Sequence, residues 1–223
     1  MKIKLLAALM IIGLLLPLQN VFAGSTLDNR DKSSFMVGIT PWGFHVPSLA
    51  TRPVTFGLYV GKVLMLGVES GEISNKQSDK DAESTASFSN QGVYARLFTG
   101  NSFNFLFAVH QRTWKGEATM TKSVYNPLTF QNETAYVTAD IEASAKIGTF
   151  GLGNQWITDT GIVIGIDWLA LSGQLGATNK VTIKTNSGMD STQAKDDLRV
   201  FNDFLNIVST LPGFFILQLG YAF

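Results

Sequence analysis

The carboxy-terminal residues alternate between apolar side chains and small or polar ones. The apolar set is Phe215, Leu217, Leu219, Tyr221 and Phe223, and the intervening set is Gln218, Gly220 and Ala222. Because successive side chains of a strand face opposite sides, one face of this segment is apolar and the other is not. Such a strand suits a wall between lipid and a polar lumen.

The same period of two recurs along the chain and predicts eight strands. They span residues 35–46, 54–60, 63–74, 87–98, 103–118, 134–151, 161–172 and 213–223. The short connections are 61–62, 99–102 and 152–160, and the long ones, expected on the outside, are 75–86, 120–133 and 173–212. Pro41 predicts a bulge or an edge in the first strand. An even strand count with short turns at one end and long loops at the other is typical of a bacterial barrel.

Aromatic residues favour a membrane barrel over a soluble β-sandwich, the alternative that alternation alone leaves open. Phe103, Phe105 and Phe107 share one face of their strand. Tryptophans lie near predicted strand ends, where aromatic girdles occur, at positions 42, 114, 156 and 168. We therefore predict an all-β, eight-stranded antiparallel up-and-down transmembrane β-barrel.

The amino terminus predicts export. Lys2 and Lys4 precede an apolar run over residues 5–18, and a small-residue cleavage pattern ends at Ala23. The run is shorter than the 18 to 20 or so residues that a membrane-spanning helix needs, so it reads as a signal peptide. The expected organisation is a signal peptide over 1–23, a short amino-terminal segment over 24–34 and a barrel over 35–223.

Charge and composition argue against other classes of protein. The chain has 17 basic and 17 acidic residues, so loss of Lys2 and Lys4 with the signal peptide leaves 15 basic ones. A nucleic-acid partner, which needs a basic stripe, is not expected. The chain has no cysteine and two histidines without metal-ligand spacing, so we expect no disulfide, metal or other cofactor.

Strand parity assigns a group of charged side chains to the lumen. They are Glu69, Arg96, His110, Arg112, Asp140, Glu142, Lys146 and Asp167. Antiparallel pairing predicts three ion pairs, Arg112 with Asp140, His110 with Glu142, and Lys146 with Asp167. The interior of an eight-stranded barrel is just wide enough to be filled by side chains, which favours a structural plug over a proton path or an acid-base site.

The last long loop carries a helical pattern over residues 195–211. Its apolar row consists of Leu198, Phe201, Phe204, Leu205, Val208 and Leu211. An amphipathic helix must cover its apolar face. Packing on the rim, a lid over the mouth and an interfacial position on the outer leaflet are all compatible with this pattern.

The strand count, the loop asymmetry, the segment 161–171 and the terminal Tyr221-Ala222-Phe223 together resemble the small outer-membrane β-barrel proteins of the OmpA, OmpX and OmpW class. The resemblance implies a monomer in a bacterial outer membrane, with lipid as a partner and with assembly machinery that reads Tyr221 and Phe223. A structural or surface-interaction protein is expected, and a narrow channel for small or hydrophobic solutes is the alternative. A lipid-modifying enzyme is disfavoured, since His45 and Ser48 lack the flanking signature of one.

Overall fold

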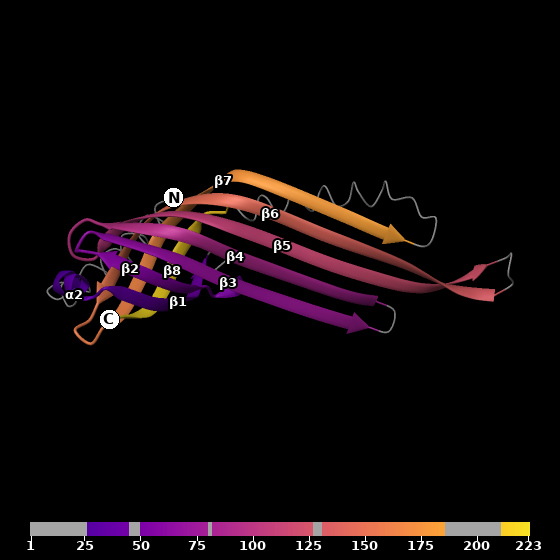
Figure 1. Ribbon diagram of the computed structural model, residues 1–223, viewed down its shortest axis with the longest axis horizontal. Coiled ribbons are helices and arrows are strands. Elements are labelled where there is room, and N and C mark those ends of the chain that lie inside the picture. Colours follow the sequence, from indigo (N-terminus) through magenta and orange to yellow (C-terminus); the bar gives the residue numbers. More distant parts are fainter. Residues whose placement is uncertain (1–25, 45–49, 80–81, 127–130, 186–210) are drawn as a thin grey trace, which may run out of the picture.

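Eight antiparallel strands form a closed barrel in the computed structural model of the protein, which describes residues 26–44, 50–79, 82–126, 131–185 and 211–223 (Figure 1). The strands are β1 (Phe35–Phe44), β2 (Val54–Val60), β3 (Leu64–Asp79), β4 (Ala82–Phe98), β5 (Phe103–Asn126), β6 (Gln131–Ile157), β7 (Ile162–Thr185) and β8 (Gly213–Ala222). Each strand pairs with its sequence neighbours, and β1 pairs with β8. The predicted all-β barrel of eight antiparallel strands is confirmed. None of the helices in the described ranges is long and apolar enough to cross a membrane.

Five strands are longer than predicted, so the outer loops expected at 75–86 and 120–133 are wrong in large part, and so is the first part, residues 173–185, of the loop expected at 173–212. β3 and β4 stay paired up to Asp79 and Ala82, and β5 and β6 stay paired up to Asn126 and Gln131. These segments are rich in Ser and Thr, and Thr119 and Thr138 share a hydroxyl hydrogen bond of 3.1 Å across the ladder. Cross-strand hydroxyl pairs support a sheet without an apolar run.

The prolonged strands build a five-stranded sheet that projects from one end of the barrel, which we call the extension (Figure 1). It comprises residues 72–79 of β3, 82–89 of β4, 113–126 of β5, 131–144 of β6 and 178–185 of β7. β1, β2 and β8 have only 7 to 10 residues and do not enter it. The opposite end of the barrel, which holds the connections at 61–63, 99–102 and 158–161, is called the turn end.

The polarity of the two sheet faces inverts where the barrel passes into the extension. On β5, the outer face carries Phe107 and Val109 in the barrel, 50% and 46% exposed, but Lys115 and Glu117 in the extension. The inner face changes in the opposite sense, from polar to apolar. Buried Arg112 lies in the barrel, and the next inward residue, Trp114, lies in the extension and stacks on Phe88 at a centroid distance of 4.0 Å. The barrel is thus apolar outside and polar inside, whereas the extension is polar outside.

The strands that close the barrel behave largely as predicted. In β8, Ile216, Gln218 and Ala222 are buried, while Leu219 and Tyr221 are exposed. The predicted outer row is interrupted at its start, because Phe215 has a left-handed backbone with φ of 50° and lies exposed next to exposed Phe214. In β1, the register with β8 shifts between Ile39 and Trp42, which confirms the bulge predicted at Pro41.

A short helix that the sequence pattern did not predict, α2 (Thr26–Lys32), lies in the amino-terminal segment beside the turn end (Figure 1). The helix predicted at 195–211 lies outside the described residues except for Leu211, which is exposed and precedes β8 in an irregular conformation. The predicted signal peptide, His45 and Ser48 also lie outside the described residues.

Candidate functional site

The barrel lumen is the candidate site because inward-facing charged side chains from four strands meet there, all of them buried except the half-buried Glu69. They are Glu69 of β3, Arg96 of β4, His110 and Arg112 of β5, and Asp167 of β7. Each stands on the inward face of its strand, as parity predicted. Together with buried amides and tyrosines they form two polar clusters, one in the middle of the barrel and one nearer the extension.

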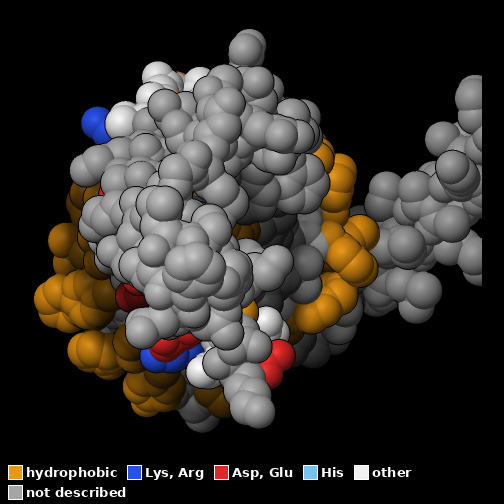
Figure 2. All heavy atoms as spheres, turned by 90° about the vertical axis from the view of Figure 1, so that its right-hand side faces the viewer, with side chains coloured by type: hydrophobic (Ala, Val, Ile, Leu, Met, Phe, Trp, Pro, Cys, Tyr) orange, Lys and Arg blue, Asp and Glu red, His pale blue; other side chains and the backbone are white. Residues whose placement is uncertain are grey.

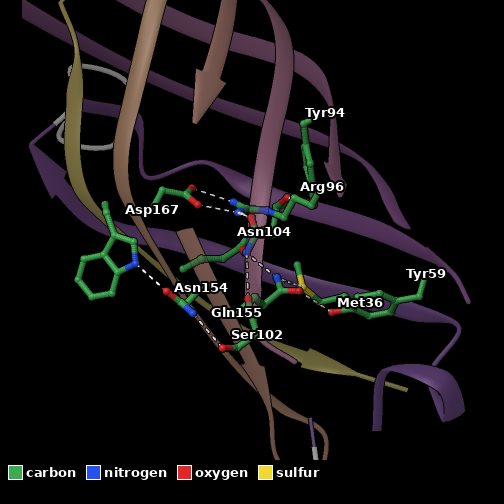
Figure 3. A network of polar contacts seen from close by, with 12 residues as sticks. Met36, Tyr59, Tyr94, Arg96, Ser102, Asn104, Asn154, Gln155 and Asp167 are labelled. Atoms are coloured by element: carbon green, nitrogen blue, oxygen red, sulfur yellow. Dashed lines mark hydrogen bonds and ion pairs between the residues drawn. The ribbon is translucent and has the colours of Figure 1, made fainter. Parts of the chain in front are cut away.

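The middle cluster is built on a bidentate ion pair that crosses the lumen. Arg96 Nη1 donates to Asp167 Oδ1 at 2.6 Å, and Nη2 donates to Oδ2 at 2.8 Å (Figure 3). Both side chains are 6% exposed. Arg96 Nη1 also donates to Asn104 Oδ1 at 2.9 Å. Since β4 and β7 are separated by two strands on the shorter way round the closed sheet, this contact spans the interior rather than following a strand pair.

The β6–β7 ladder contains a bulge next to Asp167. The register shifts between Leu152 and Gly153, and Gly153 then faces Asp167. A Cβ atom at Gly153 would approach Asp167 Oδ1 to 2.5 Å, so the glycine leaves room for the carboxylate. Trp168, next to the aspartate, donates from Nε1 to Asn154 Oδ1 at 2.7 Å.

Amide side chains extend the middle cluster towards the turn end. Gln155 Nε2 donates to Gln218 Oε1 at 3.1 Å, and Tyr59 donates its hydroxyl to Gln155 Oε1 at 3.1 Å. Asn104 and Asn154 bond to the backbone and hydroxyl of Ser102 (Figure 3). Buried polar groups are tolerated where they have partners, and this chain of amides supplies them from four strands and a turn.

The second cluster lies nearer the extension and centres on His110. Its Nε2 lies 2.9 Å from Glu69 Oε1, and Asn90 Nδ2 donates to the same oxygen at 2.8 Å. Arg112, 1% exposed, donates from Nε to Asn90 Oδ1 at 3.3 Å. Gly92 stands opposite His110 in the ladder, and a Cβ atom there would overlap the imidazole. The glycine therefore makes space for the histidine.

The three ion pairs predicted from the sequence do not form. Arg112 faces Ala145 in the ladder, while Asp140 faces Glu117, Glu142 faces Lys115, and Lys146 faces Gln111. Glu142 and Lys146 are exposed and Asp140 lies on the same face of β6, because the inward residues there are Ala143, Ala145 and Ile147. Glu142 instead contacts Lys115 at 3.5 Å on the outer face of the extension. The parity assigned to this strand is wrong.

Little empty space remains between the two clusters. A cavity of about 40 Å³ lies among Glu69, Arg96, His110 and Asp167. A water molecule needs roughly 10 to 15 Å³ on this measure, so the cavity holds only a few waters. In the part of the chain that the structure describes, no group of three or more His, Asp or Glu side chains is placed to hold a metal ion.

Helix α2 closes the turn end through its arginine. Arg30 is buried and donates from Nη1 to Lys62 O at 2.7 Å and from Nη2 to Asn101 O at 2.6 Å. Its guanidinium lies 3.5 Å from the centroid of the Phe98 ring. Burial lowers the pKa of Arg30 to about 10, so the group stays charged at neutral pH. One cation thus ties the helix to two separate turns.

A second residue of α2 reaches the remaining turn. Asn29 Nδ2 donates to Ile157 O at 3.0 Å and to Asp159 Oδ1 at 2.9 Å. On the solvent side, Lys62 lies 3.5 Å from Asp31. The seven-residue helix is therefore held by side chains at all three turns of this end. Sequence periodicity could not find it, because the segment is short and its contacts are polar.

The carboxy-terminal residues expected to signal assembly lie on the outside of the barrel. Tyr221 and Phe223 are 50% and 59% exposed. The Phe223 backbone completes the seam with β1, since its N–H donates to Phe35 O at 2.9 Å and its carbonyl accepts from Ser34 and Phe35 N–H groups at 2.9 Å.

Comparison with known proteins adds little to this description. No protein-family model matches the chain, and no curated protein matches it. Among solved structures, the chain is similar to the crystal structure of CarO from Acinetobacter baumannii. The TM-score is 0.42 at 11% sequence identity, and the match covers 86% of this chain and 97% of that chain.

Proposed function

We propose that the protein is an outer-membrane β-barrel of structural or surface-interaction type whose lumen is plugged by its own side chains. The observation that carries this proposal is the Arg96–Asp167 pair, which joins β4 to β7 across the lumen at 2.6 and 2.8 Å. A solute would have to break this pair and displace the amide chain beneath it. Breaking one buried pair costs about 3 to 5 kcal/mol, which opposes passage.

The outer wall of the barrel supports the placement in a membrane. Its exposed side chains are apolar on every strand, for example Val37 on β1, Phe56 on β2, Val93 on β4 and Ile162 on β7. Figure 2, which looks onto the end of the extension, shows hydrophobic side chains on the barrel wall at both sides of the view. An apolar surface of this extent on a monomer indicates lipid or another partner. Export by a signal peptide over 1–23 belongs to the same proposal.

The extension supports the role at the surface. Its outer face carries Glu72, Lys115, Glu117 and Glu142 in the described part, a polarity suited to water rather than lipid. On the proposed orientation, with short turns facing the periplasm, this sheet stands outside the cell. Lipid and the barrel-assembly machinery are the proposed partners, with a monomer as the working unit.

Conductance of the refolded protein in planar bilayers tests the plug. We expect no ion current from the parent, and a measurable current from an Arg96→Ala, Asp167→Ala variant, because two long side chains then leave the lumen. Insertion of both proteins into liposomes is the matched control. Steady conductance of the parent at neutral pH would overturn the plug and favour the narrow channel.

A further inference from the structure

The outer wall of the barrel is hollowed by an apolar groove of about 900 Å³. Its lining comes from six consecutive strands, beginning with Phe56 and Leu58 on β2 and ending with Leu171 on β7. The surface of a closed sheet is convex, so a groove of this size requires side chains that are smaller than their neighbours.

Ladder pairing identifies these small residues. One row across the strands reads Leu66, Ala95, Phe107, Phe150 and Leu171, and the next reads Val68, Val93, Val109 and Gly148. Ala95 and Gly148 therefore form the floor of the groove, and Phe107 and Phe150 form its walls. In these two rows the groove meets almost only carbon atoms.

The groove is oblique with respect to the barrel axis. Leu171 is the tenth residue of β7 counted from the turn end, whereas Leu58 is the third residue of β2 from that end. With a rise of about 3.3 Å per residue and a strand tilt of about 40°, the groove descends from roughly 23 Å to roughly 5 Å above the turns. This drop of about 18 Å is comparable to the thickness of one hydrocarbon leaflet, about 15 Å.

A positively charged residue stands just beyond the high end of the groove. Lys146 is exposed on the outer face of β6, two residues past Gly148. Its ladder row contains Ser70, Gln91, Gln111 and Gly176, so amide and hydroxyl groups lie beside the ammonium. No ion pair of Lys146 is found among the described residues, whereas Lys115, further up the extension, contacts Glu142 at 3.5 Å.

We propose that this groove and Lys146 form a binding site for a phosphorylated, acylated glycolipid of the outer leaflet. The acyl chain lies in the groove and runs from the polar row into the membrane. The phosphate lies at Lys146, and the side chains of Ser70, Gln91 and Gln111 supply hydrogen bonds to sugar hydroxyls. The proposal rests on the proposed membrane placement, and the sugar-binding polar row is what favours a glycolipid over a glycerophospholipid.

The test measures lipid binding to the refolded full chain by native mass spectrometry from detergent. The probes are hexa-acylated bis-phosphorylated lipid A and phosphatidylglycerol. We expect lipid A to bind at least about tenfold more tightly than phosphatidylglycerol. Lys146→Gln should weaken lipid A binding about fivefold, the usual contribution of one basic residue at a membrane surface. Ala95→Phe should weaken it more, because the ring fills the groove.

Two control variants match these changes. Lys115→Gln removes an outer-face lysine that already has a partner, and Val37→Phe enlarges an exposed wall residue outside the groove. Both should bind lipid A like the parent. Equal affinity of the parent and of the Lys146 and Ala95 variants would overturn the site, and equal affinity for the two lipids would overturn the glycolipid as its occupant.

Insertion into liposomes, followed by heat-modifiable gel mobility, separates this inference from the proposed function. If the parent inserts, but Lys146→Gln and Ala95→Phe bind lipid A as tightly as the parent does, the lipid site alone is refuted. A parent that fails to insert refutes the membrane placement, and the site with it.

Discussion

Removal of one partner of the Arg96–Asp167 pair should destabilise the barrel far more than removal of both. Asp167→Leu leaves the guanidinium of Arg96 in an interior where its side chain is 6% exposed. Arg96→Met leaves the carboxylate in the same position. The double variant removes both charges and replaces them with apolar side chains.

The contacts give the size of the effect. Asp167→Leu loses two charge-assisted hydrogen bonds, and Arg96→Met loses these two and the bond to Asn104 Oδ1. Each single variant keeps a buried charge, for which the expected cost is about 3 to 5 kcal/mol. The double variant loses the bond from Arg96 to Asn104 Oδ1 and leaves that oxygen to find water, a cost of about 1 to 3 kcal/mol. It also removes Arg96 Nε, which is buried without a hydrogen-bond partner among the described residues. The double variant should therefore lie within about 2 kcal/mol of the parent.

Urea titration of protein folded into lipid vesicles, with the folded fraction scored by heat-modifiable gel mobility, gives the four free energies of unfolding. The coupling energy from the double-mutant cycle should be at least about 3 kcal/mol. Additive effects of the two single changes would show that the pair does not cross the lumen as described. A Lys115→Gln variant, which changes an exposed charge in the extension, serves as the control and should differ from the parent by less than about 1 kcal/mol.

Three further outcomes follow from other parts of the molecule. Gly161→Ala should destabilise by about 1 to 2 kcal/mol in the same titration, because Gly161 has φ of 87°, whereas Gly116→Ala, with open space around its Cβ position, should be near neutral. Arg30→Ala should make residues 24–34 sensitive to limited proteolysis. Arg30→Lys should not restore resistance, since one ammonium group cannot replace a guanidinium that binds two carbonyls. Full resistance of the alanine variant would show that Arg30 does not hold the helix at the turn end. Deletion of Phe223 should slow insertion in cells, because the seam with β1 loses three backbone hydrogen bonds, and insertion at the parental rate and level would contradict this.

The strand count and the closure could be predicted because they depend on local alternation. Gln218 and Tyr221 fall on the faces that period two assigns to them. The barrel charges Glu69, Arg96 and Asp167 were placed inward by the same rule. Their partners could not be predicted, because the Arg96–Asp167 contact joins strands that are not neighbours and no register rule reaches across a lumen.

The failure on β6 has a different cause. The alternation of Ala143, Ala145 and Ile147 with charged residues is the same whether the apolar set faces lipid or the interior. Only the depth of the segment relative to the barrel decides between the two, and depth depends on how far β5 and β6 remain paired. The sequence of one strand does not show where the apolar face changes from outside to inside. The prediction therefore placed Glu142 and Lys146 in the lumen.

The extension also has a mechanical consequence. From Gln111 to its end at Asn126, β5 advances by 15 residue steps, or about 50 Å. A flexible chain of that length would reach only roughly 20 Å from its anchor. A surface partner that pulls on the distal end of the extension therefore acts through a stiff lever. The force reaches the barrel wall only through the strands β3 to β7. β1, β2 and β8 carry none of it directly, so shear concentrates at the two seams where loaded and unloaded strands meet, β2 with β3 and β7 with β8.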